Sequence, residues 1–239
     1  MSRNLVLLDL DGTLTKSDPG ILTAVRYAYR VLNTPIPTSE ELETFIGPPL
    51  IDSFLLHGFP QRQQALEAVD TYRHAYMGEA MFDDPHHPGQ KIPAMYLADV
   101  YQGVFQALTD LHQAGYQLAI ATCKPEPQTF KICDYFHIGS YCDGVYGASL
   151  DTSRIHKDQV IAYAFQGMGF NPDRGDRAIM VGDRWTDIDG GHAQGLTTVG
   201  VSWGYAHPGE LAEHGAEIII DKVSDLPSAV EQSFHGSGR

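Results

Sequence analysis

The chain has 239 residues, of which 30 are Asp or Glu and 16 are Lys or Arg, so its formal net charge is −14. Hydrophobic residues make up 43% of the sequence, which is enough for a packed core and too much for intrinsic disorder. The acidic charge argues against binding to nucleic-acid polymers and to anionic membranes, because both require clustered cations. It does not exclude a small anionic substrate, since a metal ion or a few well-placed cations can reverse the local field.

The three cysteines, Cys123, Cys133 and Cys142, indicate a reducing compartment. Their number is odd and none of them is spaced as CxxC, so neither a disulfide framework nor a zinc site is indicated. The apolar run at residues 5–8 is too short for a signal peptide, and no run approaches the length of a membrane span. We therefore expect a cytoplasmic protein without a membrane partner.

Short apolar runs of strand length recur along the chain. Most of them are apolar throughout, which is typical of parallel strands that are buried on both faces. Amphipathic stretches of helix length lie between most of them, and this alternation predicts an α/β fold with a doubly wound parallel sheet. The expected strands are residues 5–10, 117–122, 144–147, 178–182, 197–201 and 217–220, and the helices between them include 104–113, 127–135, 157–168 and 186–194.

One long gap interrupts the alternation after the first strand. No strand-like run follows Leu14 for about a hundred residues, and the gap instead contains helical patterns. We expect a small α-helical cap domain at residues 16–90, inserted into a Rossmann-like core domain formed by residues 1–15 and 91–239. The expected cap helices lie at residues 21–32, from about Thr38, at 50–57 and at 62–81, and residues 83–89 are expected to form a loop.

The first motif that carries chemistry is Asp9-Leu10-Asp11-Gly12-Thr13 at the end of the first strand. The two-residue period of a strand places Asp9 and Asp11 on the same side, and Gly12 allows a sharp turn. Two carboxylates crowded at the carboxyl edge of a parallel sheet raise a pKa or recruit a cation. An Asp-rich turn without a ligand is the alternative.

A second acidic motif, Gly182-Asp183-Arg184-Trp185-Thr186-Asp187, follows the expected strand at residues 178–182. Asp183 and Asp187 are four residues apart, so they face one point if a helix begins near Arg184. Carboxylate oxygens are hard ligands, and Asp9, Asp183 and Asp187 together predict a Mg²⁺ site. An acid that only caps a helix is the alternative for Asp183.

Two weaker signals accompany these acids. Thr122 ends a strand, and its hydroxyl together with the amides that follow it, at Cys123 and beyond, is a common grip for phosphate. Lys157 begins a helix and offers a cation. Taken alone, Thr122 is more simply a helix cap and Lys157 a solvated side chain. A functional role for either residue is indicated only because the acidic motifs are also present.

These four motifs, in this order and at these strand ends, resemble those of the haloacid dehalogenase superfamily of phosphohydrolases over essentially the whole chain. The residues that carry the resemblance are Asp9–Thr13, Thr122, Lys157 and Gly182–Asp187. Residues 45–50, 122–126, 147–151 and 203–205 resemble, more narrowly, the phosphoglycolate phosphatase and 5′-nucleotidase-like branch. Two departures are the long stretch 83–95 and Cys123, where Ser is common.

The resemblance implies a Mg²⁺-dependent phosphatase that hydrolyses small organic monoesters through an aspartyl-phosphate. It implies that Asp9 is the nucleophile and that Asp11 is the general acid, with Thr13 bonded to Asp11. The same resemblance implies a metal site, a phosphate site and specificity residues. The metal ligands would be Asp9, the main-chain carbonyl of Asp11 and Asp183, with Asp187 in support.

The phosphate group would be held at Thr122, Cys123 and Lys157. The residues expected to determine substrate specificity are Gly47, Pro48, Pro49, Lys124 and Arg184.

Other functions stay open at this point. A sugar-phosphate mutase similar to β-phosphoglucomutase shares the four motifs, and a non-catalytic binding protein could use the same fold. Asp11 disfavours a dehalogenase, which has no alkoxide to protonate. The expected partner is a small phosphorylated metabolite, either phosphoglycolate, a nucleoside monophosphate or a sugar phosphate. Trp185 is expected either to line the pocket or to pack under its helix, and His86 and His87 are expected in a solvated loop.

Overall fold

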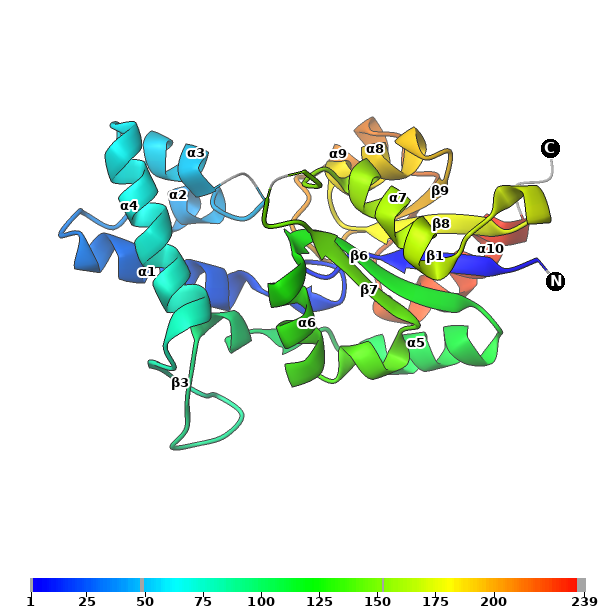
Figure 1. Cartoon of the computed structure of the whole chain (residues 1–239), viewed down its shortest axis with the longest axis horizontal. Coiled ribbons are helices and arrows are strands. Elements are labelled where there is room, and N and C mark those ends of the chain that lie inside the picture. Colours follow the sequence, from blue (N-terminus) through cyan, green and yellow to red (C-terminus); the bar gives the residue numbers. More distant parts are fainter. Residues whose placement is uncertain (1, 48–49, 152, 236–239) are drawn as a thin grey trace. The chain divides into compact units, whose positions relative to one another are not determined.

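The structure is a computed structural model, and it describes residues 2–47, 50–151 and 153–235. Six parallel strands form its main sheet in the order β10-β9-β8-β1-β6-β7 (Figure 1). From β1 the chain winds outward in both directions, so the expected doubly wound sheet is confirmed. The strands are β1 (Asn4–Leu8), β6 (Gln117–Pro125), β7 (Gly144–Ala148), β8 (Arg177–Gly182), β9 (Thr197–Val201) and β10 (Ile218–Ile220).

Helices cover both faces of this sheet. One face carries α5, α6 and α10, and the other carries α7 and α8 (Figure 1). Within the described ranges, every helix is too short or too polar to span a bilayer. The helices of this part are α5 (Val104–Gln113), α6 (Glu126–Tyr135), α7 (Lys157–Met168), α8 (Trp185–Ala193), α9 (Glu210–Glu213) and α10 (Leu226–His235), with 3₁₀ turns at Ile138–Tyr141, Pro172–Arg174 and Val223–Asp225.

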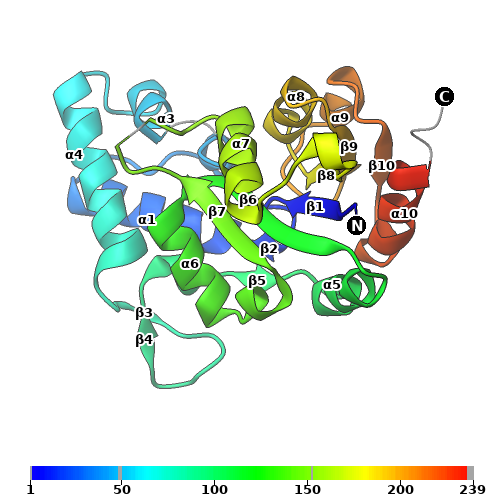
Figure 2. The same cartoon turned by 45° about the vertical axis from the view of Figure 1, so that its right-hand side comes forward.

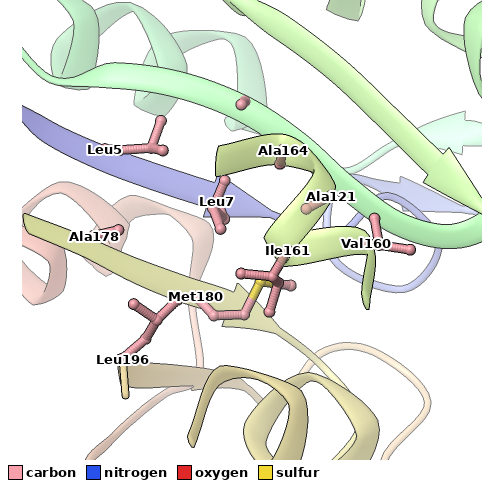
Figure 3. Packing of buried hydrophobic residues seen from close by; sticks show 10 residues of the cluster. Leu5, Leu7, Ala121, Val160, Ile161, Ala164, Ala178, Met180 and Leu196 are labelled. Carbon is pink, nitrogen blue, oxygen red and sulfur yellow. The ribbon is translucent and has the colours of Figure 1, made fainter. Parts of the chain in front are cut away.

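The core lies against the strands on both faces of the sheet. Leu5 and Leu7 belong to a buried cluster with residues of α7, and Leu7 lies beside Ile161 (Figure 3). Val6 and Leu8, which alternate with them, are also inaccessible to solvent, and this explains why β1 is apolar throughout. The cluster on the α7 face consists of Leu5, Leu7, Ala119, Ala121, Val160, Ile161, Ala164, Ala178, Met180 and Leu196.

Contacts between Cα atoms divide the chain into two compact units, Met1–Lys16 with Val100–Arg239, and Ser17–Asp99. The second unit is the helical insert after β1. Its centre is a group of aromatic rings, and its boundaries as a cap domain stay a prediction. The unit contains α1 (Asp18–Val31), α2 (Ser39–Glu43), α3 (Leu50–Leu56), α4 (Arg62–Arg73), the π-helical turn His74–Gly78 and the 3₁₀ turn Ala94–Tyr96, around Tyr29, Phe45, Phe54 and Phe59.

Short strands interrupt the gap in which the sequence predicts none. β3 (Phe82–Asp83) pairs antiparallel with β4 (Lys91–Ile92), so the expected loop at 83–89 is the tip of a hairpin (Figure 2). Asp84 closes this tip, because its carboxylate accepts N–H bonds from His86 and His87. Two-residue strands are too short to produce an alternating pattern. The others are β2 (Thr15–Lys16) and β5 (Asp99–Val100).

The substitution Leu7→Ala tests the packing of the core. Leu7 is fully buried between the sheet and α7, so we expect the cavity left behind to lower the free energy of unfolding by about 3 kcal/mol. Urea denaturation followed by circular dichroism measures this change. Leu150→Ala is the control, because Leu150 is 71% exposed; equal losses in the two variants would contradict the assignment.

Candidate metal and phosphate site

The end of β1 brings Asp9 to the carboxyl edge of the sheet. The Asp9 N–H donates to the carbonyl of Val181 at 2.9 Å, so Asp9 is tied to the neighbouring strand β8. The chain then turns at Gly12, whose φ is +86°. A Cβ atom at this position would lie 2.2 Å from Asp183 Oδ2. Only glycine therefore permits both the turn and the close approach to Asp183.

Asp183 lies at the end of β8 and is fully buried. Its Oδ1 accepts a bond from the Thr13 hydroxyl at 3.0 Å, and its Oδ2 accepts one from the Tyr205 N–H at 2.8 Å. The expected bond from Thr13 to Asp11 is therefore wrong, because the turn at Gly12 carries the Thr13 hydroxyl toward β8. A Cβ at Gly204 would lie 2.3 Å from the Asp183 Cβ, so the Tyr205 amide reaches Asp183 only because residue 204 has no side chain.

Asp187 lies in the first turn of α8 and is also buried. Its Oδ2 accepts a bond from the Arg184 N–H at 3.0 Å. One carboxylate oxygen from each of Asp9, Asp183 and Asp187 lies within 4.8 Å of the other two. The structure thus brings together the three acids that the sequence predicts as a metal site.

Lys157 is the cation within this acidic cluster. Its Nζ lies 2.8 Å from Asp9 Oδ1 and 2.6 Å from Asp187 Oδ1, and it donates to the carbonyl of Ala121 at 3.0 Å. Burial alone would lower the pKa of Lys157, but Asp187 and Asp9 outweigh it and raise this pKa above its ordinary value. Lys157 is therefore charged, and it balances one of the three carboxylates.

Burial and the excess negative charge of the cluster raise the pKa values of Asp183 and Asp187. Burial, together with the neighbouring Asp187 and Asp9, raises the pKa of Asp183 well above its ordinary value. Burial also raises the pKa of Asp187 to about 6, although Lys157 opposes this rise. Three converging carboxylates with a single lysine are a donor set that fits a hard divalent cation such as Mg²⁺, which prefers oxygen ligands.

Asp11 has a different environment from Asp9. Its Oδ2 lies 2.7 Å from Lys124 Nζ, and its side chain is 24% exposed. Its Oδ1 is buried and has no hydrogen-bond partner in the part of the chain that the structure describes. The predicted specificity residue Lys124 is thus a partner of the predicted general acid, which the sequence did not indicate.

The segment after Ala121 supplies polar groups to the same edge. Thr122 is buried, and its hydroxyl oxygen accepts the N–H of Lys124 at 3.3 Å. The pairing of β6 with β7 changes register between Ala121 and Pro125, so β6 extends irregularly beyond the expected end at Thr122. Cys123 lies in this irregular stretch and is exposed. The backbone here departs from a regular ladder.

The side chains of Arg184 and Trp185 follow Asp183 directly and contact groups outside the acidic cluster. The Arg184 side chain is only 16% exposed and bonds to Glu210. Trp185 is 42% exposed, and its ring lies 5.5 Å from the ring of His214, so it packs on the surface. Gly47 is exposed within the helical insert, and Pro48 and Pro49 lie outside the described residues. His87 bonds to Asp84 at 2.9 Å, at the exposed hairpin tip.

Trp203, Tyr205 and Glu210 contribute to the site without a signal in the sequence for the contacts they make. Residues 203–205 mark a resemblance in the sequence, but nothing indicates that the Trp203 Nε1 donates to the carbonyl of Thr13 at 3.1 Å, or that the Tyr205 amide binds Asp183. Glu210 is a buried acid in a short helix and gives no periodic signal. Gly209 precedes Glu210 and has a φ of +89°. This glycine is the local signal in the sequence that the chain turns tightly here.

Comparison with known proteins identifies the family. A model of the haloacid dehalogenase-like hydrolases matches residues 6–201. Tyrosine-protein kinase PtkA of Mycobacterium tuberculosis is 35% identical over 223 residues, which are 93% of this chain and 67% of that protein. A 5′-nucleotidase of Pseudomonas aeruginosa is 31% identical over 210 residues, 87% of each chain. Among solved structures, a predicted phosphatase from Clostridium acetobutylicum has a TM-score of 0.80 and 31% identity, and the match covers 97% of this chain and 100% of that one.

The raised pKa of Asp187 predicts a pH dependence of stability for the metal-free protein. Its pKa rises from 3.8 in the unfolded chain to about 6 in the folded protein, so the unfolded state loses its proton first. The free energy of unfolding should therefore fall as the pH rises from about 4 to about 6. We expect this contribution to be about 3 kcal/mol.

Urea unfolding of the metal-free protein at several pH values measures this effect. The variant Asp187→Asn should lack the part of this fall in the free energy of unfolding that comes from residue 187, because an amide side chain does not titrate. Added Mg²⁺ should restore stability to the wild type at pH 7, where the carboxylates are charged. The same pH slope in the two proteins would contradict the assignment.

Proposed function

We propose that this chain, which belongs to the haloacid dehalogenase-like hydrolases, is a Mg²⁺-dependent phosphatase of small organic phosphate monoesters. The observation that carries the proposal is the cluster of Asp9, Asp183 and Asp187 around Lys157, at the carboxyl edge of a parallel sheet. Ligands of open α/β sheets bind at this edge. The supported substrate class is a phosphate ester with a small organic leaving group, such as phosphoglycolate or a nucleoside monophosphate.

Asp9 is the proposed nucleophile. One of its carboxylate oxygens forms a bond to phosphorus, and the bond between phosphorus and the leaving oxygen breaks, which leaves an aspartyl-phosphate. Lys157 lies 2.8 Å from Asp9 Oδ1 and holds this carboxylate in place. Water then attacks the phosphorus of the intermediate and regenerates the Asp9 carboxylate, so that alcohol and inorganic phosphate are the products.

Asp11 is the proposed general acid for the first step and general base for the second. It gives its proton to the leaving alkoxide and takes one from the attacking water. Because Lys124 occupies Asp11 Oδ2 at 2.7 Å, proton transfer through that oxygen requires the ion pair to open. Oδ1, which has no hydrogen-bond partner within the described ranges, is the other oxygen that can carry the proton.

The phosphoryl oxygens need positive partners as negative charge spreads over them in the transition state. The Thr122 hydroxyl, the amide of Cys123 and the ammonium of Lys157 are the groups proposed to bind them. Asp9, the main-chain carbonyl of Asp11, Asp183 and Asp187 are the residues proposed to hold Mg²⁺ or its waters. When bound, the ion neutralises the carboxylates and the phosphoryl oxygens, which otherwise repel each other.

The substitution Asp9→Asn tests the nucleophile. We expect it to lower the turnover of p-nitrophenyl phosphate at saturating Mg²⁺ by at least about a thousandfold, because an amide cannot form the phosphoryl intermediate. Acid quenching followed by mass spectrometry should find one added phosphoryl group on Asp9 of the wild type only. Asp173→Asn, an exposed acid in the same unit, is the control, and normal turnover by Asp9→Asn would refute the assignment.

The substitution Asp11→Asn tests the general acid by comparing leaving groups. An alkyl phosphate needs a proton on its leaving oxygen, whereas p-nitrophenolate leaves with little help. We therefore expect Asp11→Asn to slow formation of the phosphoenzyme by roughly 10²–10⁴-fold for an alkyl ester, and by much less for p-nitrophenyl phosphate. Rapid-quench measurement of the first turnover gives both rates; equal losses would contradict the role of an acid.

A panel of phosphate esters with detection of inorganic phosphate identifies the substrate. The panel contains phosphoglycolate, nucleoside monophosphates and hexose phosphates. Release of phosphate supports the phosphatase. Isomerisation of a hexose phosphate without release of phosphate would instead identify a mutase, and no reaction with any ester would favour a binding protein on the same fold.

A further inference from the structure

The segment that leaves β9 binds both acidic motifs. The Trp203 Nε1 donates to the carbonyl of Thr13 at 3.1 Å, and the Tyr205 N–H donates to Asp183 Oδ2 at 2.8 Å. The same segment ends at Glu210, the first residue of α9. Residues 203–210, which we call the β9–α9 strap, therefore contact the chain after β1 and the chain after β8.

Glu210 ties the end of this strap to the start of α8. Its Oε1 accepts the Arg184 Nε–H at 2.8 Å and the Trp185 N–H at 2.8 Å, and its Oε2 accepts the His207 N–H at 3.1 Å. The Glu210 side chain is only 8% exposed. Burial raises its pKa, but Arg184 and the two backbone donors outweigh burial and lower this pKa. Glu210 is therefore a carboxylate that three local donors stabilise.

Arg184 links Glu210 to Asp187. The main-chain N–H of Arg184 donates to Asp187 Oδ2 at 3.0 Å, while its side chain donates to Glu210. The start of α8 thus has two acceptors: Asp187 takes the N–H of residue 184, and Glu210 takes the N–H of residue 185. Each acid satisfies a donor that the helix itself leaves open.

This arrangement matters because the acids repel one another. Asp183 and Asp187 are buried near Asp9, and among the described residues Lys157 is the one cation paired with these acids. The link between them is short, because α8 begins at Trp185, and without a restraint the turn at Asp183 and Arg184 would let the carboxylates spread. The Tyr205 amide fixes Asp183, and the Arg184 pair with Glu210 fixes the turn that carries Asp187. Both restraints belong to one strap.

We propose that Glu210 and Arg184 form a positioning pair that holds Asp183 and Asp187 at the separation needed to bind a divalent cation. Arg184 is then a positioning residue and makes no contact with substrate, which replaces the specificity role expected from the sequence. The inference rests on the proposed metal site. Partners of this kind, one bond removed from the ligands, typically change metal affinity by 10–100-fold.

The chain offers a matched control on the other edge of the sheet. Asp176 is also buried, and it also accepts two backbone N–H bonds and one guanidinium bond. Its donors are the N–H groups of Arg3 and Asn171 and the side chain of Arg3, at 3.0, 3.0 and 2.9 Å. Asp176 precedes β8, whereas the acidic cluster follows it, so Asp176→Asn removes a similar network without touching the metal site.

The experiment measures the dissociation constant of Mn²⁺ by electron paramagnetic resonance on the full chain, without substrate. We expect Glu210→Gln to weaken Mn²⁺ binding roughly tenfold, and Asp176→Asn to lose stability while it keeps the wild-type affinity. Wild-type affinity in Glu210→Gln would overturn the inference and leave the proposed phosphatase intact. Failure of the wild type to bind Mn²⁺ would overturn both.

Arg184→Gln provides the second variant, because it leaves the two backbone bonds of Glu210 in place if Glu210→Gln does not fold. We expect it to weaken Mn²⁺ binding to a similar degree, and the double variant to show little further loss, since the two side chains act through each other. With Mn²⁺ at saturation, the KM for p-nitrophenyl phosphate should stay at its wild-type value. A raised KM in Arg184→Gln, with unchanged Mn²⁺ affinity, would assign Arg184 to the substrate and overturn the proposal.

Discussion

The convergence of Asp9, Asp183 and Asp187 is the constraint on which the rest of this structure depends. Three buried carboxylates with one lysine are unfavourable in a folded chain, and the raised pKa values of Asp183 and Asp187 reflect this cost. The surrounding chain is built to bring these acids together in spite of it. Gly12, Gly182 and Gly204 each approach an acid so closely that a Cβ atom would overlap it. Buried charge is concentrated where a cation is expected, and perturbed pKa values of this kind are typical of functional sites.

The topology of the sheet explains how distant segments meet at this point. β1 lies between β6 and β8, so the residues that follow these three strands share one edge. Asp9, Thr122 and Asp183 are far apart in the sequence and become neighbours for this reason. Parallel strands buried on both faces give long apolar runs, and each run here ends in a polar residue. Strand periodicity and strand ends therefore predict the fold and place Asp9 and Asp183 at one edge. Asp187 and Lys157 lie at the starts of helices, and Lys157 is expected at the site only because of the other motifs.

Features that depend on loop geometry were not predictable in the same way. Thr13 binds Asp183 and not Asp11, because the direction of its hydroxyl is decided by the turn at Gly12. The bond between Asp11 and Lys124 joins two loops, and no spacing in the sequence encodes it. Glu210 lies in a four-residue helix that has no period to read. The two-residue strands β3 and β4 could not be predicted for a similar reason. Their pairing is determined by the turn at Asp84 and not by a pattern of side chains.

The net charge of −14 acquires a more specific meaning from these contacts. The cations nearest the acidic edge already have carboxylate partners: Lys157 has Asp9 and Asp187, Lys124 has Asp11, and Arg184 has Glu210. A phosphate that approaches this edge must therefore compete with protein carboxylates for the same lysines. A divalent cation held by Asp9, Asp183 and Asp187 would change that competition at Lys157, because it would neutralise the acids that hold this ammonium group. On the proposed function, metal and phosphate should consequently bind with positive coupling.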